Sequence, residues 1–128
     1  MKKLTLPTLL TVFLLISLGL KAQVVEIEVA PNVINIESRG TVVTVHTDIS
    51  FGFVDVSTCY LNGIFIKSYK ADSRGFFVAK FNIDDVKELE GLKINGMNTL
   101  ILTGKEKDGN SFSGSQEIKV IKVIPKGK

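Results

Sequence analysis

Apolar and polar residues alternate along most of the chain after residue 22, and turn residues interrupt the alternation at short intervals. A period of two is typical of β-strands that bury one face. The pattern predicts strands over residues 25–29, 33–36, 41–48, 56–61, 64–69, 76–81, 98–103 and 117–124. Both residues of the Asn62-Gly63 pair accept positive φ, so this pair predicts a tight hairpin.

Residues 82–91 depart from this alternation. Ile83, Val86 and Leu89 recur at helical spacing, acidic residues occupy the first turn, and Gly91 closes the segment, which predicts one short helix or a pair of turns. Seven to eight short strands with at most one helical turn predict an all-β domain. We expect an antiparallel β-sandwich, with a small barrel as the alternative.

The first 22 residues have the layout of a secretory signal peptide. Lys2 and Lys3 precede a mostly apolar stretch from Leu4 to Leu20, and the expected cleavage is at Ala22–Gln23. Cleavage there leaves one domain, residues 23–128, in the periplasm or outside the cell, with no membrane span after cleavage. An uncleaved anchor helix is the alternative, although the apolar stretch is short for a membrane span.

The predicted cleavage changes the charge of the domain. Three of the 16 basic residues of the chain, Lys2, Lys3 and Lys21, lie in the leader, so 13 remain against 13 acidic residues. A nucleic-acid-binding protein needs an excess of basic residues on one face. The balanced charge therefore argues against nucleic acid as a partner.

Cys59 is the only cysteine and His46 the only histidine. A single thiol forms no internal disulfide, and the apolar neighbours of Cys59 predict a buried and inert side chain, with an intermolecular bridge as the alternative if it is exposed. One histidine without paired cysteines predicts no zinc site. Cys59 and His46 are formally a nucleophile and a base, but neither lies in a glycine-framed turn, so we expect no enzyme.

Two further stretches resemble ligand sites without completing them. Four acidic residues gather in the helical segment, where they are typical of a solvated helix start; they are Asp84, Asp85, Glu88 and Glu90. The stretch TGKEKDGNSFSGSQ (103–116) has the glycine spacing of a phosphate loop but lacks its lysine, and Phe112 occupies a calcium-ligand position. We therefore expect a hairpin at 103–116, and no metal or cofactor.

Sugar-binding sandwiches present exposed aromatic side chains, and the chain contains no tryptophan. The candidate ligand contacts are Tyr60, Tyr69, Phe76 and Phe77. We expect a non-catalytic module with a binding or structural role, whose partner is an envelope or extracellular protein. A carbohydrate-binding module that uses the exposed Tyr and Phe side chains is the alternative.

Two stretches carry a resemblance to a known family. Residues 27–40, IEVAPNVINIESRG, and residues 100–115, LILTGKEKDGNSFSGS, resemble the opening and the last hairpin of Ig-like β-sandwich modules of bacterial and archaeal exported and cell-surface proteins. Residues 56–63 are similar to the middle strand of that family. The resemblance implies a non-catalytic module. Family members often carry a calcium-like loop, which residues 70–75, with one acid beside an arginine, do not match.

Overall fold

The computed structural model describes residues 22–124, and this range contains ten strand segments, one α-helix and one 3-10 helix. The strands are β1 (Ala22–Val24), β2 (Ile27–Ala30), β3 (Val33–Asn35), β4 (Val42–Ser50), β5 (Val54–Leu61), β6 (Ile64–Phe65), β7 (Ser68–Ala71), β8 (Phe76–Asn82), β9 (Gly96–Glu106) and β10 (Ser111–Ile121). The helices are η1 (Phe51–Phe53) and α2 (Ile83–Lys87). The leader predicted at residues 1–22 lies almost entirely outside the described range.

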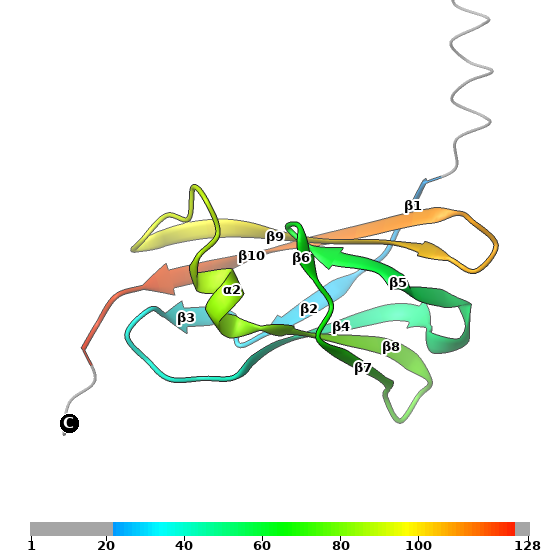
Figure 1. The fold of residues 1–128 in the computed structure, drawn as a ribbon, viewed down its shortest axis with the longest axis horizontal. Helices are drawn as coiled ribbons and strands as arrows, with labels where there is room; N and C mark the ends of the chain where they lie inside the picture. Colours follow the sequence, from blue (N-terminus) through cyan, green and yellow to red (C-terminus); the bar gives the residue numbers. More distant parts are fainter. Residues whose placement is uncertain (1–21, 125–128) are drawn as a thin grey trace, which may run out of the picture.

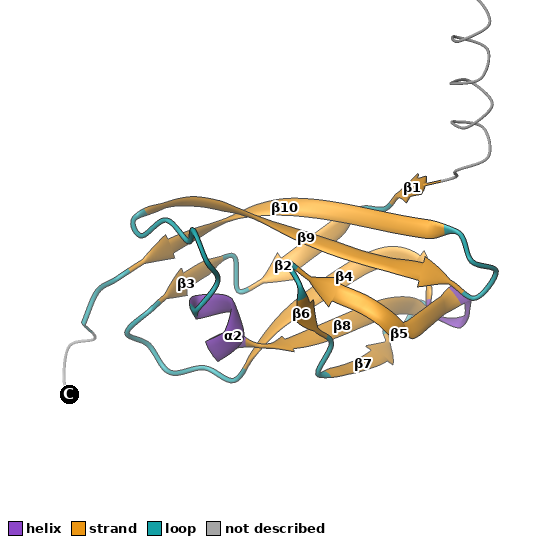
Figure 2. Ribbon diagram, turned by 45° about the horizontal axis from the view of Figure 1, so that its top comes forward, coloured by secondary structure: helices purple, strands orange, loops and turns teal. Residues whose placement is uncertain are grey.

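The strands form two layers that lie face to face (Figure 1). The larger layer has the order β1-β10-β9-β5-β6, with β3 also paired to β10, and the smaller has the order β2-β4-β8-β7. β1 and β3 run parallel to β10 near its two ends, and the other pairs in the described range are antiparallel. The domain is therefore mostly β and sandwich-like, as predicted (Figure 2).

The structure has ten strand segments where seven to eight were predicted, because one predicted strand divides between the sheets and a further segment, β1, precedes the first predicted strand. That first predicted strand covers residues 25–29 and corresponds to β2, whereas β1 ends at Val24. β1 pairs with β10 of the larger sheet, whereas β2 pairs with β4 of the smaller one. The crossing takes place at Val25, whose amide donates to the Ser113 carbonyl over 2.9 Å and whose side chain is buried.

The divided strand was predicted as one return strand over residues 64–69, and that prediction is wrong. The Ile66 amide donates to the Cys59 carbonyl of the larger sheet, while the next amide, Lys67, donates to the Lys80 carbonyl of the smaller one. Ile66 is buried between the layers. Burial of this side chain fixes the chain where it passes from β6 to β7.

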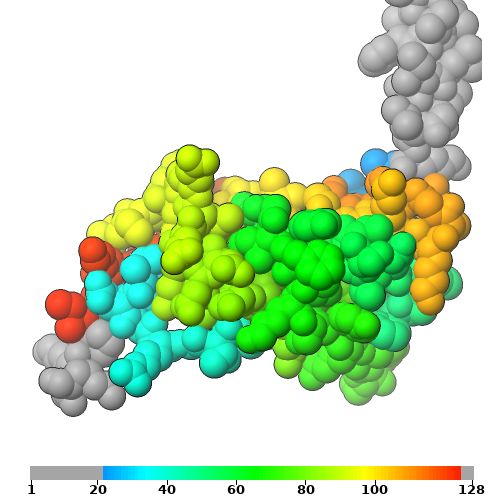
Figure 3. Space-filling model, viewed as in Figure 1, coloured from blue at the N-terminus to red at the C-terminus, as the bar shows by residue number. Residues whose placement is uncertain are grey.

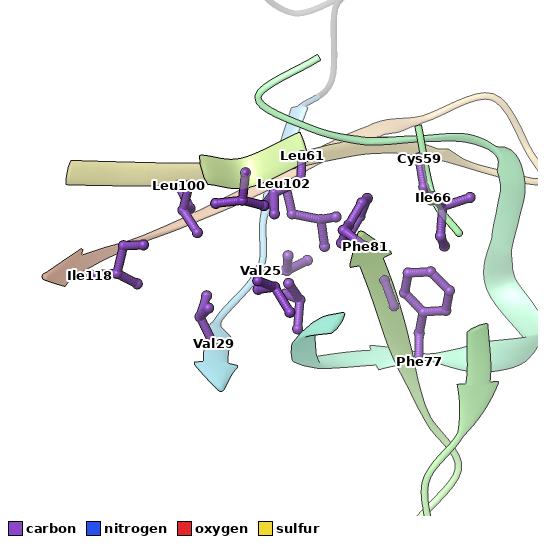
Figure 4. Packing of buried hydrophobic residues seen from close by; sticks show 14 of the residues in the cluster. Val25, Val29, Cys59, Leu61, Ile66, Phe77, Phe81, Leu100, Leu102 and Ile118 are labelled. Atoms are coloured by element: carbon purple, nitrogen blue, oxygen red, sulfur yellow. The ribbon is translucent and has the colours of Figure 1, made fainter. Parts of the chain in front are cut away.

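Both sheets contribute to one hydrophobic core, part of which is drawn in Figure 4. Its largest fully buried side chains are Phe77, Phe81, Phe112, Ile34, Leu61, Leu100, Leu102 and Ile118. Full burial of one such side chain stabilises the fold by roughly 1.5–3 kcal/mol. Since the chain has no internal disulfide, this packing holds the sandwich together.

The short helix and the closing hairpin lie where the sequence predicts them. The Asn82 side chain caps α2 by accepting a hydrogen bond from the Asp84 amide over 3.0 Å, and Gly91 has a φ of 80°. Residues 103–116 join β9 to β10 through a turn in which Gly109 has a φ of 94°. Phe112 lies in the core from this hairpin, 2 % exposed.

Candidate functional site

The outer surface of the larger sheet carries a patch of uncharged side chains that points away from the core. One row of paired residues crosses five strands. In the strand order β1, β10, β9, β5, β6, its members are Val24, Ser113, Thr103, Tyr60 and Phe65. Ser115 and Ile101 form the next row. We call these seven residues the aromatic face; six are exposed and Ser113 is half-buried.

Tyr60 and Phe65 form the aromatic end of the aromatic face, at the β5–β6 edge of the sheet. Their ring centroids lie 5.4 Å apart with an interplanar angle of 61°, and the side chains are 40 % and 54 % exposed. Edge-to-face pairs of this kind are mutually stabilising, although their exposure to water is unfavourable. An exposed pair with these contacts is the clearest candidate for a ligand contact.

The Asn62-Gly63 turn sets this geometry. Asn62 and Gly63 have φ values of 48° and 85°, so a two-residue loop pairs Leu61 with Ile64 and then Tyr60 with Phe65. Phe65 was missed as a candidate by sequence reasoning. The two-residue loop was a sufficient indication, because its register places Phe65 directly opposite Tyr60.

Asn62 also ties the turn to β9. Its Oδ1 accepts a hydrogen bond from the Ile101 amide over 2.6 Å, and its Nδ2 donates to the Thr99 carbonyl over 3.1 Å. These two bonds hold the end of β5 against the middle of β9. The backbone that carries Tyr60 and Phe65 is therefore held in place against β9.

A cleft of about 350 Å³ lies beside this turn. Figure 3 shows the loop that follows α2 standing clear of the surface near the β5–β6 region. The cleft is lined by polar residues that include Asn62, Lys93, Thr99 and Glu117, and by the apolar residues Leu89, Leu92 and Met97. Asn62 lines the cleft and follows Tyr60 by two residues, so the cleft continues from the aromatic face.

The outer surface of the smaller sheet differs in charge. Its central row runs Glu28, His46, Val78 and Lys70 across β2, β4, β8 and β7, and Val78 is covered by its neighbours. A shallow hollow of about 550 Å³ on that side is lined by charged groups, including Glu26, Asp48 and Arg74. The two outer surfaces of the sandwich are therefore chemically distinct.

The four predicted aromatic contacts do not share one surface. Tyr69 lies on β7, where it stacks on Phe51 with centroids 6.3 Å apart, and Phe76 lies under the Arg74 guanidinium at 5.0 Å. Phe77 is fully buried between the sheets, so it has no surface for a ligand to contact. Of the four, only Tyr60 belongs to the aromatic face.

The structure separates the groups that a thiol enzyme would bring together. Cys59 is buried on β5 of the larger sheet, and His46 is exposed on β4 of the smaller one. Burial raises the pKa of the Cys59 thiol to about 11. The burial of the thiol predicted from the sequence is confirmed, and its inertness stays a prediction.

Cys59 is expected to react with a thiol reagent only after unfolding. The folded chain at pH 8 should give almost no reaction with Ellman's reagent over minutes, and unfolding in guanidinium should release one thiol per chain, the number in the sequence. Because the folded pKa is raised, the thiol contributes stability below pH 9.0, which is lost as the pH rises toward 11. Complete reaction of the native chain within minutes would contradict the burial.

Within residues 22–124, His, Cys, Asp and Glu side chains form no group of three or more that could hold a metal ion. The same range has no helix with the length and hydrophobicity that a membrane crossing requires.

The chain was compared with protein-family models, with curated proteins and with solved structures, and none of them matches. The resemblance to the Ig-like module family therefore stays a prediction. What is established is a two-sheet β-rich domain with an uncharged patch, the aromatic face, on the outer surface of the larger sheet and a charged hollow on that of the smaller one.

Proposed function

We propose that this chain is an exported, non-catalytic binding module with an Ig-like fold, and that it binds its ligand through the aromatic face. The observation that carries the proposal is the exposed Tyr60–Phe65 pair within a row that has no charged side chain. Contact surfaces of proteins are depleted in charge at their centre and enriched in aromatic residues. The outer surface of the smaller sheet carries charged side chains, as a surface in contact with water usually does.

The strand order supports the Ig-like part of the proposal. In Ig sandwiches, strands A, B, E and D form one sheet, and C, F and G form the other, with C′ added beside C in the larger variants. The order β2-β4-β8-β7 corresponds to A-B-E-D, and β6-β5-β9-β10 corresponds to C′-C-F-G, with every strand in its proper chain position. In this assignment β1 and β3 are extra N-terminal pieces that pair with strand G.

Export is supported by the basic and apolar layout of residues 1–22, and the non-catalytic part by the separation of Cys59 from His46. An exported module needs a surface that recognises something outside the cytoplasm. Binding through the sheet surface of strands C′, C, F and G does not use the loops at either end of the sandwich.

The proposal is tested by capture from a cell-envelope fraction on immobilised full chain. The Tyr60→Ala/Phe65→Ala double variant should reduce the captured material about tenfold or more, because removal of central aromatic contacts typically costs that much. Tyr69→Ala is the matched control, since Tyr69 is similarly exposed, at 49 %, but lies on the smaller sheet. Equal capture by the double variant, at an unchanged melting temperature, would refute the proposed surface.

A further inference from the structure

We infer that the ligand of the aromatic face is a neutral oligosaccharide, with one sugar against Tyr60 and Phe65 and its neighbour in the cleft beside Asn62. This inference rests on the proposed function, because it names the ligand class for the same surface. Its support comes from three features of the site: the hydroxyl-bearing neighbours of the rings, the angle between the rings, and the polar cleft.

The first feature is the composition of the rows around the rings. Thr103 lies next to Tyr60 across the strands, followed by Ser113, while Ser115 pairs with Ile101. Hydroxyl groups both donate and accept hydrogen bonds, as do the hydroxyls of a sugar. The charged residues of these strands lie outside the two rows, with Lys105 beyond one row and Glu117 beyond the other. A charged ligand would find no counter-charge within the two rows of the face.

The second feature is the angle of 61° between the two rings. With rings at this angle, the pair forms a corner and not a continuous flat platform. A corner fits one pyranose, whose C–H face packs on one ring while its edge meets the other. Aromatic rings supply apolar contact with a defined orientation, and the phenol of Tyr60 adds a polar tip. This geometry does not fit the flat surface of a long polymer.

The third feature is the cleft that continues from the face. Tyr60 and Asn62 are two residues apart, about 7 Å along a strand. The cleft is lined by Thr99, by Lys93 and by the acidic residues Glu90 and Glu117, together with the half-buried apolar residues Leu89 and Leu92. Its volume of about 350 Å³ lies at the small end of ligand sites, which range over about 300–1,000 Å³. Donors and acceptors around an apolar floor suit a second sugar ring.

A protein partner fits the same surface less well. Strong protein–protein contacts centre on Trp, Tyr and Arg side chains packed in a dry core. The aromatic face contains one tyrosine and neither of the other two, and small hydroxyl-bearing residues take three of its seven positions. The Thr103 hydroxyl donates to the Tyr60 carbonyl over 3.5 Å, and its oxygen, with the hydroxyls of Ser113 and Ser115, can pair with the hydroxyls of a sugar. The observations therefore favour the glycan, and a protein ligand becomes an outcome of the test.

The inference is tested with the full chain by titrating cellohexaose, chitohexaose and mannohexaose in separate calorimetry experiments. We expect saturable binding of at least one of the three. Tyr60→Ala and Phe65→Ala should each weaken that binding about tenfold or more, and Thr99→Val should weaken it about two- to tenfold by removing one hydroxyl. Tyr69→Ala should leave the affinity unchanged, and all four variants should keep the melting temperature within a few degrees of the parent.

Two outcomes overturn the inference. If none of the three oligosaccharides binds, or if binding ignores Tyr60, Phe65 and Thr99, the glycan assignment is wrong. The envelope capture separates this failure from failure of the proposed function. Capture of a protein that still depends on Tyr60 and Phe65 would refute the sugar and retain the binding surface, whereas loss of dependence in both experiments would refute both.

Discussion

Replacing Phe77 with alanine is expected to lower the free energy of unfolding by about 4 kcal/mol. Phe77 is fully buried on β8, and its ring lies 6.4 Å from that of Phe51. Removal of a buried phenylalanine costs about 3–5 kcal/mol, because transfer energy is lost and a cavity remains. Denaturant titration of the full chain, followed by far-UV circular dichroism, measures the change. The free energy of unfolding of a domain of this size is roughly 5–15 kcal/mol, so this loss would remove a large part of its stability.

Phe76→Ala is the matched control for this prediction. Phe76 precedes Phe77 on the same strand but points to the opposite side, where it is half-buried under Arg74. An exposed cation–π contact is worth about 0.5–1 kcal/mol, so the expected loss is near that size. A smaller loss for Phe77→Ala than for Phe76→Ala would mean that the face of β8 has been assigned the wrong way round.

The second large effect is expected at Gly114, where alanine should destabilise the fold by about 3 kcal/mol. A Cβ at this position would lie 2.5 Å from the Val25 carbonyl oxygen and 2.7 Å from Ile27 Cγ2. Overpacking costs about 1–3 kcal/mol and occasionally more, and here one of the clashing atoms belongs to the backbone. The Val25 segment can move away only by weakening its 2.9 Å hydrogen bond to Ser113. Thermal unfolding of the two chains measures the difference.

Gly52→Ala is the control for this substitution. A Cβ at Gly52 would have no atom within 4 Å, so the expected change is within about 0.5 kcal/mol. If Gly114→Ala were equally harmless, the crossing of the N-terminal segment beside β10 would not be as close as described. The pair of variants therefore isolates the effect of close approach from the general cost of replacing glycine.

Local patterns were sufficient for much of the fold. The period of two predicted the strands, and the turn at Asn62-Gly63 formed as predicted because its two positive φ values suit these residues. The capped helix at Asn82 followed from the same kind of local rule. Turn residues and alternation act over a few positions, so one sequence is enough to read them.

The division of strands between the sheets could not be predicted in this way. Ile66 continues the alternation of its neighbours, yet its amide bonds to one sheet and the amide of Lys67 to the other. The choice of Phe77 as a surface contact was wrong for a related reason. Phe76 and Phe77 are adjacent and chemically alike, but neighbours in a strand point to opposite faces, and only the assembled sandwich decides which face is buried.

By itself, the sequence determined a mostly β chain with one short helix, a single buried thiol and a closing hairpin at residues 103–116. These depend on local conformation and on composition. Only the tertiary structure decided which distant segments pair, and so placed Thr103 and Ser113 in one row with Tyr60, and the β5–β6 turn beside the cleft. Long-range pairing depends on packing between segments distant in the chain, as when β9 lies between β5 and β10. The aromatic face exists only through that pairing.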